Sequence, residues 1–464
     1  MRNIFIRQKQ QIIGATVFAV VLFLYVATLA PTLTQKHLGI DSGDLLTAAF
    51  NFGVPHPTGY PTYIILLKLF SVLIPFGNFA LKGNLFSALL GATSCILVYY
   101  IIINILSKID HFSARNSVNK LLVATFGAIA LGTSPLFWSQ SSITEVYTLN
   151  SCFIGLLILL SLNISYKTNT NESLSKFPKQ MRLLTLFGFV LGIGIGNHLT
   201  IILLIPPIMF WLILKIGWQK LLSPTTLLGL ASGLMIYLYI PIAATQTPVV
   251  NWGDADNLKG FIWLITGNIY GNNLSISTFP NQLFFTTKLL IQQINITGLF
   301  LGITGIFYLG KHNLSLLVTT LSFLILILAY SALYIARDSE VYIIPAVLIF
   351  SIWIGIGSYF IIEGLLTYVP KQISKLSRFG LLASIVIAGF IAIPGLNILF
   401  NYDYQNLRGD YSDYNYYRNI VDELPTNTVL ITDSDEDTFG LWYMSYVDNA
   451  RPDIVVIAMP LLQF

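Results

Sequence analysis

The sequence carries very little charge. Only 10% of its 464 residues are Asp, Glu, Lys or Arg, whereas 55% are hydrophobic; an ordinary soluble domain has roughly 25% charged residues. This composition excludes a soluble enzyme. The formal net charge of +4 does not indicate nucleic-acid binding either, because the basic residues lie at the ends of apolar runs and form no basic stripe.

Cysteine is almost absent. The two cysteines, Cys95 and Cys152, both lie inside apolar runs. A disulfide framework and a Cys-rich metal site are therefore excluded. No internal repeat or low-complexity tract stands out.

What the sequence does have is apolar runs of about 20 residues, the length that crosses a hydrocarbon core about 30 Å thick. We expect an all-α polytopic membrane protein whose transmembrane domain covers residues 1–400. The first run is too long for the core of a cleavable signal peptide, so we interpret it as an uncleaved anchor. The eleven predicted spans are 12–30, 84–106, 121–139, 146–164, 183–197, 199–214, 224–243, 286–309, 314–334, 341–362 and 380–400.

Basic residues set the predicted orientation. Three of them in MRNIFIRQKQ precede the first span and place the N-terminus on the cytoplasmic side. The apolar segment 63–75 is short, flanked by prolines and interrupted by Lys68, so we expect an interfacial or re-entrant helix, with a dipping hairpin as the alternative. A full span there would move the basic loop 108–120 outside. With eleven spans, most basic residues lie inside, most acidic residues lie outside, and the C-terminus is outside.

A polar, Tyr-rich segment follows at 401–464. Residues 428–432 are typical of a strand, 438–447 of a short helix and 453–459 of a second strand. They predict the start of a small α/β segment on the outer side, too short to form a core by itself. We expect this segment either to be incomplete or to dock on the membrane domain.

Candidate catalytic residues gather in the first outer loop, 31–83, which contains GIDSGDLLTAAFNFGVPHPTGYP. Asp41 and Asp44 are three residues apart, so both carboxylates gather at one helix N-terminus if Asp41 caps a helix there. Such a pair performs acid–base chemistry or holds a cation, while Asp41 or Ser42 acting merely as a cap explains the spacing equally well. His56 lies between two prolines. This position suits an oriented polar side chain at the level of the lipid headgroups, and it is also compatible with an ordinary loop histidine that contacts solvent.

Further polar residues fall on the same predicted membrane face. Glu145 begins the fourth span, where a carboxylate near hydrocarbon is costly and is therefore a functional candidate. Asn197 and His198 interrupt an apolar stretch and mark a tight outer turn, next to glycines that permit close helix packing. Arg337 either binds a phosphate or pairs with Asp338.

The long outer loop, 244–285, contains NWGDADN and many aromatic residues. Trp252 and Asp254 are candidates for substrate binding, since Trp suits sugar stacking, although an interfacial aromatic belt is the default explanation. Three aspartates, Asp433, Asp435 and Asp437, alternate in DSDEDTF near the C-terminus. They either chelate a cation or form a solvated turn that caps a helix.

These motifs resemble a known family. DSGDLLTAAFNFGVPHPTGYP followed by NLFSALLGATSCILVYY, with TEVYTLN, GIGNHLT, NWGD and DTFGLWY, is similar to the bacterial and eukaryotic membrane family that includes the plexin-type transmembrane O-mannosyltransferases. That family belongs to the GT-C superfamily, in which the donor is a sugar on a polyprenyl phosphate. An acidic residue of the first outer loop serves there as base or helps position acceptor or metal. Asp41 and Asp44 match the two acidic positions, the second often Glu in the family, and His56 with Pro57 matches its His-Pro element.

The resemblance implies an inverting membrane glycosyltransferase that moves mannose or a similar hexose from a polyprenyl phosphate to a hydroxyl of a protein or glycan acceptor. Displacement at the anomeric carbon needs a base, for which we choose Asp41 with Asp44 beside it. The leaving phosphate needs positive or hydrogen-bonding groups. Candidates for this role are His56, His198 and Arg337. Candidates for substrate binding are Glu145, Asn197, Trp252 and Asp254. The residues require no particular cofactor, and a divalent cation stays an option.

The alternative function is a multi-span transporter or lipid flippase, which predicts ionisable residues near mid-membrane and pseudo-symmetric halves. Few charges fall in span centres and no halves repeat, so the glycosyltransferase is preferred. A non-catalytic scaffold is disfavoured because both Asp41 and Asp44 are present. We expect a bacterial plasma membrane rather than the endoplasmic reticulum, since nothing resembles a retrieval signal; membrane lipids are partners and nucleic acid is not.

Overall fold

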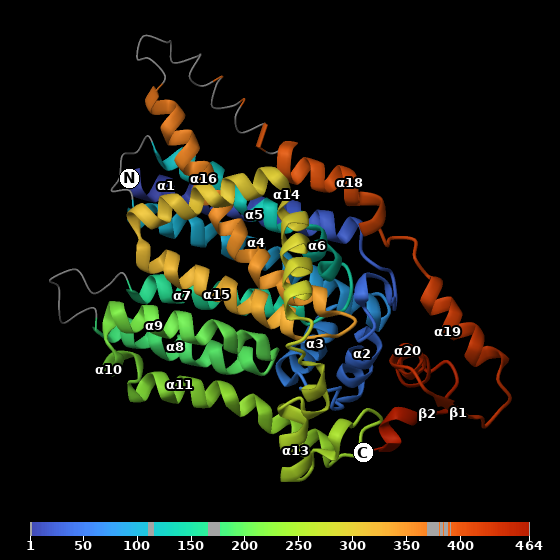
Figure 1. The fold of residues 1–464 in the computed structure, drawn as a ribbon. Helices are drawn as coiled ribbons and strands as arrows, with labels where there is room; N and C mark the ends of the chain where they lie inside the picture. The colour runs from blue at the N-terminus through green and yellow to red at the C-terminus, as the bar shows by residue number, and fades with distance from the viewer. Residues whose placement is uncertain are drawn as a thin grey trace.

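The computed structural model of the protein describes residues 2–109, 116–165, 177–368, 380, 384, 388–389 and 391–463. Long helices run side by side in a bundle (Figure 1). They are α1 (Arg2–Ala27), α4 (Phe79–Ile109), α5 (Asn116–Gly132), α7 (Tyr147–Ser165), α8 (Phe177–Ile195), α9 (Ile205–Ile216), α11 (Pro224–Leu234), α14 (Phe279–His312), α15 (Leu314–Leu333) and α16 (Ile344–Tyr368). The shorter helices are α2 (Ser42–Asn51), α3 (Pro61–Leu73), α6 (Pro135–Ser141), α10 (Trp218–Leu221), α12 (Tyr239–Ala244), α13 (Leu258–Ile265) and α18 (Leu396–Gln405).

The bundle has the dimensions of a membrane domain. Within the described ranges, eight helices are long and apolar enough to cross a membrane, and nine if α5 and α6 count as one span. These two helices meet at an angle of 69°, because Pro135 opens α6 and has no N–H to continue the α5 hydrogen-bond ladder. The span predicted at 121–139 is therefore bent near its outer end. The segment predicted to span at 183–197 is helical as α8, which is not among the eight, and much of the span predicted at 380–400 lies outside the described residues.

Helix α14 contains a second break. Asn295 has φ 51° and ψ 178°, values that no α-helix accommodates. Its side-chain oxygen accepts hydrogen bonds from the N–H groups of Thr297 and Gly298 at 3.1 and 3.2 Å and so caps the following half of the helix. The preceding half lies crosswise to the bundle (Figure 1). The span predicted at 286–309 is thus interrupted in its middle.

Helices α8 and α11 pack closely through glycine. A Cβ atom on Gly192 would lie 2.7 Å from the carbonyl oxygen of Leu230 and from the backbone nitrogen of Leu234, which leaves no room for a side chain. This confirms that glycines here permit close helix packing. The chain then turns and continues as the 3₁₀ segment η3 (Leu199–Leu204) into α9, as the tight outer turn predicts.

The two ends of the bundle carry different structures. The N-terminus, α10 and the turn between α14 and α15 lie at one end (Figure 1). The other end carries α2, α3 and α13 (Figure 1). Helix α3 is the short apolar helix expected for an interfacial segment. The loops thus divide between the ends as the predicted spans require.

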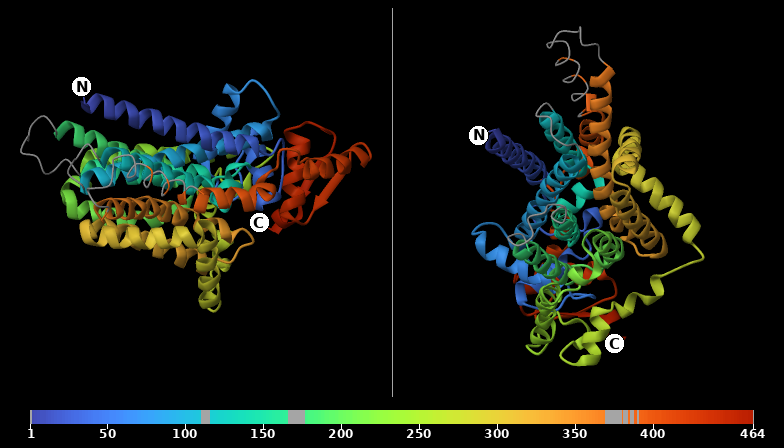
Figure 2. Two further views of the ribbon diagram at one scale, coloured as in Figure 1. Left: turned by 90° about the horizontal axis from the view of Figure 1, so that it is seen from above. Right: turned by 90° about the vertical axis from the view of Figure 1, so that its left-hand side faces the viewer.

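The C-terminal segment packs on the second end of the bundle (Figure 2). It contains α19 (Ser412–Glu423), β1 (Val429–Thr432), α20 (Asp435–Tyr446) and β2 (Val455–Ala458). The strands pair in parallel, with Val429 opposite Val455, so the predicted strand–helix–strand unit is confirmed. A Cβ atom on Gly43 would lie 2.6 Å from the carbonyl carbon of Phe439. This close approach of α2 to α20 shows that the segment docks on the membrane domain.

Candidate active site

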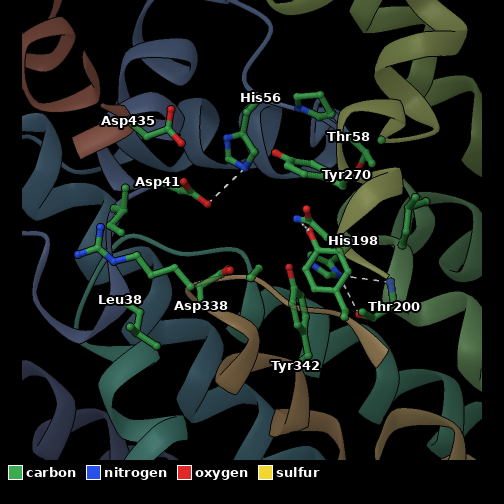
Figure 3. A pocket seen from close by; sticks show the side chains of 18 of the residues that line it. Leu38, Asp41, His56, Thr58, His198, Thr200, Tyr270, Asp338, Tyr342 and Asp435 are labelled. Atoms are coloured by element: carbon green, nitrogen blue, oxygen red, sulfur yellow. Dashed lines mark hydrogen bonds and ion pairs between the residues drawn. The ribbon is translucent and has the colours of Figure 1, made fainter. Parts of the chain in front are cut away.

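A cavity of about 740 Å³ opens between the end of the bundle and the C-terminal segment. Its walls come from the first outer loop, the turn after α8, residues 266–274, the end of α15 and the start of α20. Side chains from these segments face one another across it (Figure 3). The fold therefore brings to one place several polar residues that are far apart in the sequence.

Asp41 occupies the N-terminal end of α2, where its carbonyl accepts the N–H of Leu45 at 3.0 Å. Its carboxylate makes no capping hydrogen bond. It lines the cavity instead, with 32% of the side chain exposed. Burial raises the pKa of Asp41 to about 6, although the positive charge of His56 opposes this. A carboxylate with such a pKa is suited to accept a proton near neutral pH.

His56 connects the two aspartates of the first loop. Its Nε2 lies 3.4 Å from Asp41 Oδ2, and its Nδ1 lies 2.6 Å from Asp44 Oδ2. Burial alone would lower the pKa of His56, but the charge of Asp41 and the hydrogen bond to Asp44 outweigh it and raise the pKa to about 9. His56 is therefore an imidazolium between two carboxylates at neutral pH.

Asp44 is the buried anchor of this arrangement. It is completely buried and does not line the cavity. Besides the imidazole, it accepts the backbone N–H of His56 at 2.9 Å and the indole N–H of Trp252 at 3.2 Å. Trp252 is itself buried, so the structure places it behind the cavity wall. Asp254, two residues further on, is exposed and lies outside the cavity lining.

Glu145 and Asn197 are also buried and do not line the cavity. Burial, reinforced by the charges of Asp41 and Asp338, raises the pKa of Glu145 well above its usual range. Asn197 donates to the carbonyl of Val146 at 3.2 Å. It thereby ties the turn after α8 to the start of α7.

His198 lines the cavity, which in Figure 3 lies between it and Asp41. Its Nδ1 accepts the backbone N–H of Thr200 at 3.3 Å and is 2.7 Å from Thr200 Oγ1, which in turn accepts from Asn150 Nδ2 at 3.0 Å. A backbone N–H is always a donor, so Nδ1 is unprotonated and the neutral ring carries its proton on Nε2. Burial, with the charge of His56, lowers the pKa of His198 to about 4. His198 is therefore a neutral hydrogen-bond donor.

Arg337 lies at the rim of the cavity, with 72% of its side chain exposed. It forms an ion pair with Glu436 at the start of α20. Asp338, the partner considered from the sequence, instead accepts the hydroxyl of Tyr147 at 3.0 Å. Arg337 therefore links the turn after α15 to the C-terminal segment.

Of the tyrosines that line the cavity, the sequence singled out only Tyr270, as one of the outer-loop aromatic residues that fit sugar stacking or an interfacial belt. Among the described residues, those that line it are Tyr60, Tyr147, Tyr270, Tyr330, Tyr334 and Tyr342. Two of them belong to quoted motifs, Tyr60 to the first-loop motif that ends in PHPTGYP and Tyr147 to TEVYTLN, whereas the others are scattered among the 24 tyrosines of the chain. Only the fold shows that they share one site.

In the part of the chain that the structure describes, side chains of the kinds that bind metal ions do not cluster into a metal site. No group of three His, Cys, Asp or Glu side chains there is arranged to hold a metal ion. Of the three alternating aspartates, Asp433 precedes α20, whereas Asp435 and Asp437 lie in its first turn, where Ser434 Oγ accepts the N–H of Asp437 at 3.2 Å. The helix-capping explanation of this motif therefore describes its local structure.

Comparisons with known proteins agree with the first-loop motif. A family profile, the protein O-mannosyl-transferase TMEM260 N-terminal domain, matches residues 41–222, and the TMEM260-associated domain 2 matches residues 413–464. The crystal structure of ArnT from Cupriavidus metallidurans bound to undecaprenyl phosphate has a TM-score of 0.60 at 11% identity, over 97% of this chain and 90% of that chain. The chain therefore has the fold of this membrane protein, and its sequence is similar to that of protein O-mannosyl-transferases. The resemblance seen in the sequence is thus confirmed.

Individual relatives and solved structures match nearly the whole chain. The protein O-mannosyl-transferase tmem260 of Dictyostelium discoideum is 27% identical over 97% of this chain and 58% of the relative, and that of Mus musculus is 26% identical over 97% and 63%. The chain thus spans about three fifths of the length of these curated relatives. The Archaeoglobus fulgidus oligosaccharyltransferase AglB, in complex with an inhibitory peptide and a dolichol-phosphate, has a TM-score of 0.53 at 12% identity, over 96% of this chain and 64% of that chain. These matches do not favour a transporter or flippase.

Proposed function

We propose that the chain transfers mannose or a similar hexose from a polyprenyl-phosphate donor to a hydroxyl group of a protein acceptor. The observation that carries this proposal is the placement of Asp41, a cavity-lining carboxylate held by His56, across the cavity from the neutral donor His198. The acceptor and sugar class are supported by relatives named protein O-mannosyl-transferase. The donor class is supported by fold neighbours bound to undecaprenyl phosphate or dolichol-phosphate.

In the proposed reaction, Asp41 accepts the proton of the acceptor hydroxyl as that oxygen attacks the anomeric carbon. The bond from this carbon to the phosphate oxygen breaks, and the lipid phosphate leaves with the electron pair. Attack and departure on opposite faces invert the anomeric centre. His56 favours the ionised form of Asp41 before the attack, because its positive charge lies 3.4 Å away. Asp44 keeps that charge in place, since it is the buried partner on the other side of the ring.

The leaving phosphate needs hydrogen-bond donors that are already in position. His198 offers its Nε2 proton and, being neutral, is not drawn toward the carboxylates of the cavity. Arg337 adds positive charge at the rim, where its present partner is Glu436. We assign the shorter-range contact to His198 and the longer-range attraction to Arg337, because His198 is buried and Arg337 is exposed.

The position of the cavity suits a lipid-linked donor. It lies at the end of the bundle that carries the short apolar helix α3 (Figure 1). An apolar helix too short to span the bilayer suits the membrane interface, at the depth of lipid phosphates. By the positive-inside rule this end is the outer or lumenal one, and the N-terminus is cytoplasmic.

A transfer assay tests the proposal. Purified protein is given polyprenyl-phosphate [³H]mannose and Ser/Thr-containing peptides, as wild type, Asp41→Asn and the control Asp254→Asn. Loss of a general base lowers the rate by about a thousandfold, whereas the exposed Asp254 is expected to tolerate its isosteric change. An Asp41→Asn variant as fast as wild type contradicts the assignment of the base. Wild-type protein that transfers no polyprenyl-linked sugar but carries a solute into vesicles contradicts the proposed function. A parallel EDTA arm separates metal-dependent from metal-free transfer.

A further inference from the structure

Asp338 is a cavity carboxylate that the proposed mechanism does not use. It lies in the turn between α15 and the 3₁₀ segment η7 (Ser339–Ile343), and it lines the cavity. Figure 3 shows its side chain directed toward the space between Asp41 and His198. We propose that Asp338 and Tyr342 form the subsite that binds the hydroxyl-bearing sugar ring of the donor. This inference rests on the proposed function.

The charge of Asp338 is not neutralised by its neighbour, because Arg337 pairs with Glu436. Within the described residues, no basic side chain forms an ion pair with Asp338. One of its oxygens, Oδ2, accepts the Tyr147 hydroxyl at 3.0 Å, which fixes the orientation of the carboxylate. An ionised carboxylate has about four acceptor sites, so sites remain for ligand hydroxyls.

Tyr342 supplies a fixed aromatic surface beside this carboxylate. Its ring packs edge-to-face against Tyr334, Tyr330 and Tyr147, with centroid distances of 5.3, 5.6 and 6.2 Å. It also lies 5.9 Å from the His198 ring. Edge-to-face contacts of this kind hold a ring in one orientation. Tyr342 therefore reaches the cavity as part of an ordered cluster.

A hexose matches this pair of groups. Its hydroxyls donate to a carboxylate through charge-assisted hydrogen bonds, and its C–H face packs on an aromatic ring. A phosphate does not match, because the negative charge of Asp338 repels it. In Figure 3, Asp338 and Tyr342 border the same side of the cavity, between Asp41 and His198. A sugar ring held there has its anomeric carbon between Asp41, the proposed base, and His198, the proposed hydrogen-bond donor to the leaving phosphate.

Equilibrium binding separates this subsite from the rest of the site. The full chain in nanodiscs is titrated with polyprenyl-phosphate mannose and with polyprenyl phosphate that lacks the sugar. Asp338→Asn keeps the size of the side chain but removes its charge, and we expect about tenfold weaker binding of the mannosyl lipid. Binding of the sugar-free lipid is expected not to weaken, because loss of the negative charge removes a repulsion from the phosphate; retained binding also reports that the variant is folded. Asp254→Asn is the matched control and is expected to bind both lipids as wild type does.

Two results overturn the subsite while leaving the proposed function standing. One is an Asp338→Asn variant that binds the mannosyl lipid as tightly as the wild type does, when the wild type also transfers the sugar. The other is an equal loss of affinity for both lipids, which indicates a structural role. Wild-type protein that binds neither lipid contradicts the proposed function as well.

Donors with single hydroxyls removed identify the contact. The tenfold difference between wild type and Asp338→Asn is expected to vanish for the deoxymannosyl lipid that lacks the contacting hydroxyl, and to persist for the others. A full difference with every monodeoxy donor contradicts direct contact between Asp338 and the sugar.

Discussion

The cavity has two walls that are built in different ways. The wall from the first outer loop holds Asp41, and behind it His56 and Asp44 are buried and joined by a 2.6 Å contact. The wall from the C-terminal segment carries exposed acidic residues and is tied across the rim by the ion pair between Glu436 and Arg337, whose side chain is 72% exposed. Buried charged contacts fix geometry, whereas an exposed pair is worth only about 0–1 kcal/mol. We therefore expect the first wall, with Asp41, to carry the chemistry and the second wall, with Glu436, to tether the C-terminal segment.

After loss of the base itself, removing the buried anchor of the first wall is expected to have the largest effect. Asp44→Asn leaves the His56 imidazolium without its buried carboxylate, which costs about 3–5 kcal/mol when a buried pair is broken. Because Asp41 then loses its positioning, we expect transfer to fall on the order of a hundredfold. Steady-state transfer and thermal unfolding measure the two effects. Asp254→Asn is the matched control, and an Asp44→Asn variant with unchanged rate and stability contradicts the anchoring role.

The pH profile tests the charge state of the same wall. Asp41 must be ionised to act as a base, and its raised pKa of about 6 means that kcat/KM decreases as the pH falls through 6 instead of near 4. His56→Gln removes the cation that lowers the pKa of Asp41. We therefore expect the acid limb to move upward by about one pH unit and the rate at pH 6 to fall by about fivefold, because the ionised fraction of Asp41 decreases. An acid limb at the same pH in both proteins shows that His56 does not interact with the base.

Much of the fold follows from the sequence, because apolar runs report membrane spans directly. The interruption at Asn295 does not, since its apolar surroundings resemble an ordinary span and the break depends on one side chain that caps the next half-helix. The strand–helix–strand unit was predictable from local pattern. Its contact with α2, where Gly43 approaches Phe439, requires the tertiary structure.

In the site, too, local contacts were predictable from the sequence and tertiary contacts were not. Asp41, Asp44 and His56 share one loop, so their proximity could be anticipated from the sequence. Trp252 and Asp254 are only two residues apart, yet one reaches Asp44 and the other is exposed. The left-handed conformations of Gly253 (φ 75°) and Asp254 (φ 43°) turn the chain between these side chains, and residue spacing contains no information about such a turn.

The opposite side of the cavity offers a smaller test. Thr200→Val removes the hydroxyl that contacts His198 Nδ1 at 2.7 Å but keeps the backbone N–H donor. Loss of one such hydrogen bond costs about 1 kcal/mol, which corresponds to about a fivefold lower kcat/KM. Thr200→Ser keeps the hydroxyl and is expected to retain wild-type kinetics. Equal losses in both variants indicate that the methyl group, and not the hydrogen bond, is what the site requires.

The exposed rim is expected to respond least. If the Arg337–Glu436 pair only tethers the C-terminal segment, Arg337→Gln and Glu436→Gln break the same contact and change kcat/KM equally, by about threefold or less. If Arg337 also attracts the donor phosphate, the two variants diverge. Arg337→Gln then raises the donor KM, whereas Glu436→Gln frees the guanidinium and lowers it, and both effects weaken as salt increases because exposed charges are screened. Donor titrations at low and high ionic strength measure this difference. A loss of a hundredfold or more in Glu436→Gln would place essential chemistry on the second wall and reverse the comparison.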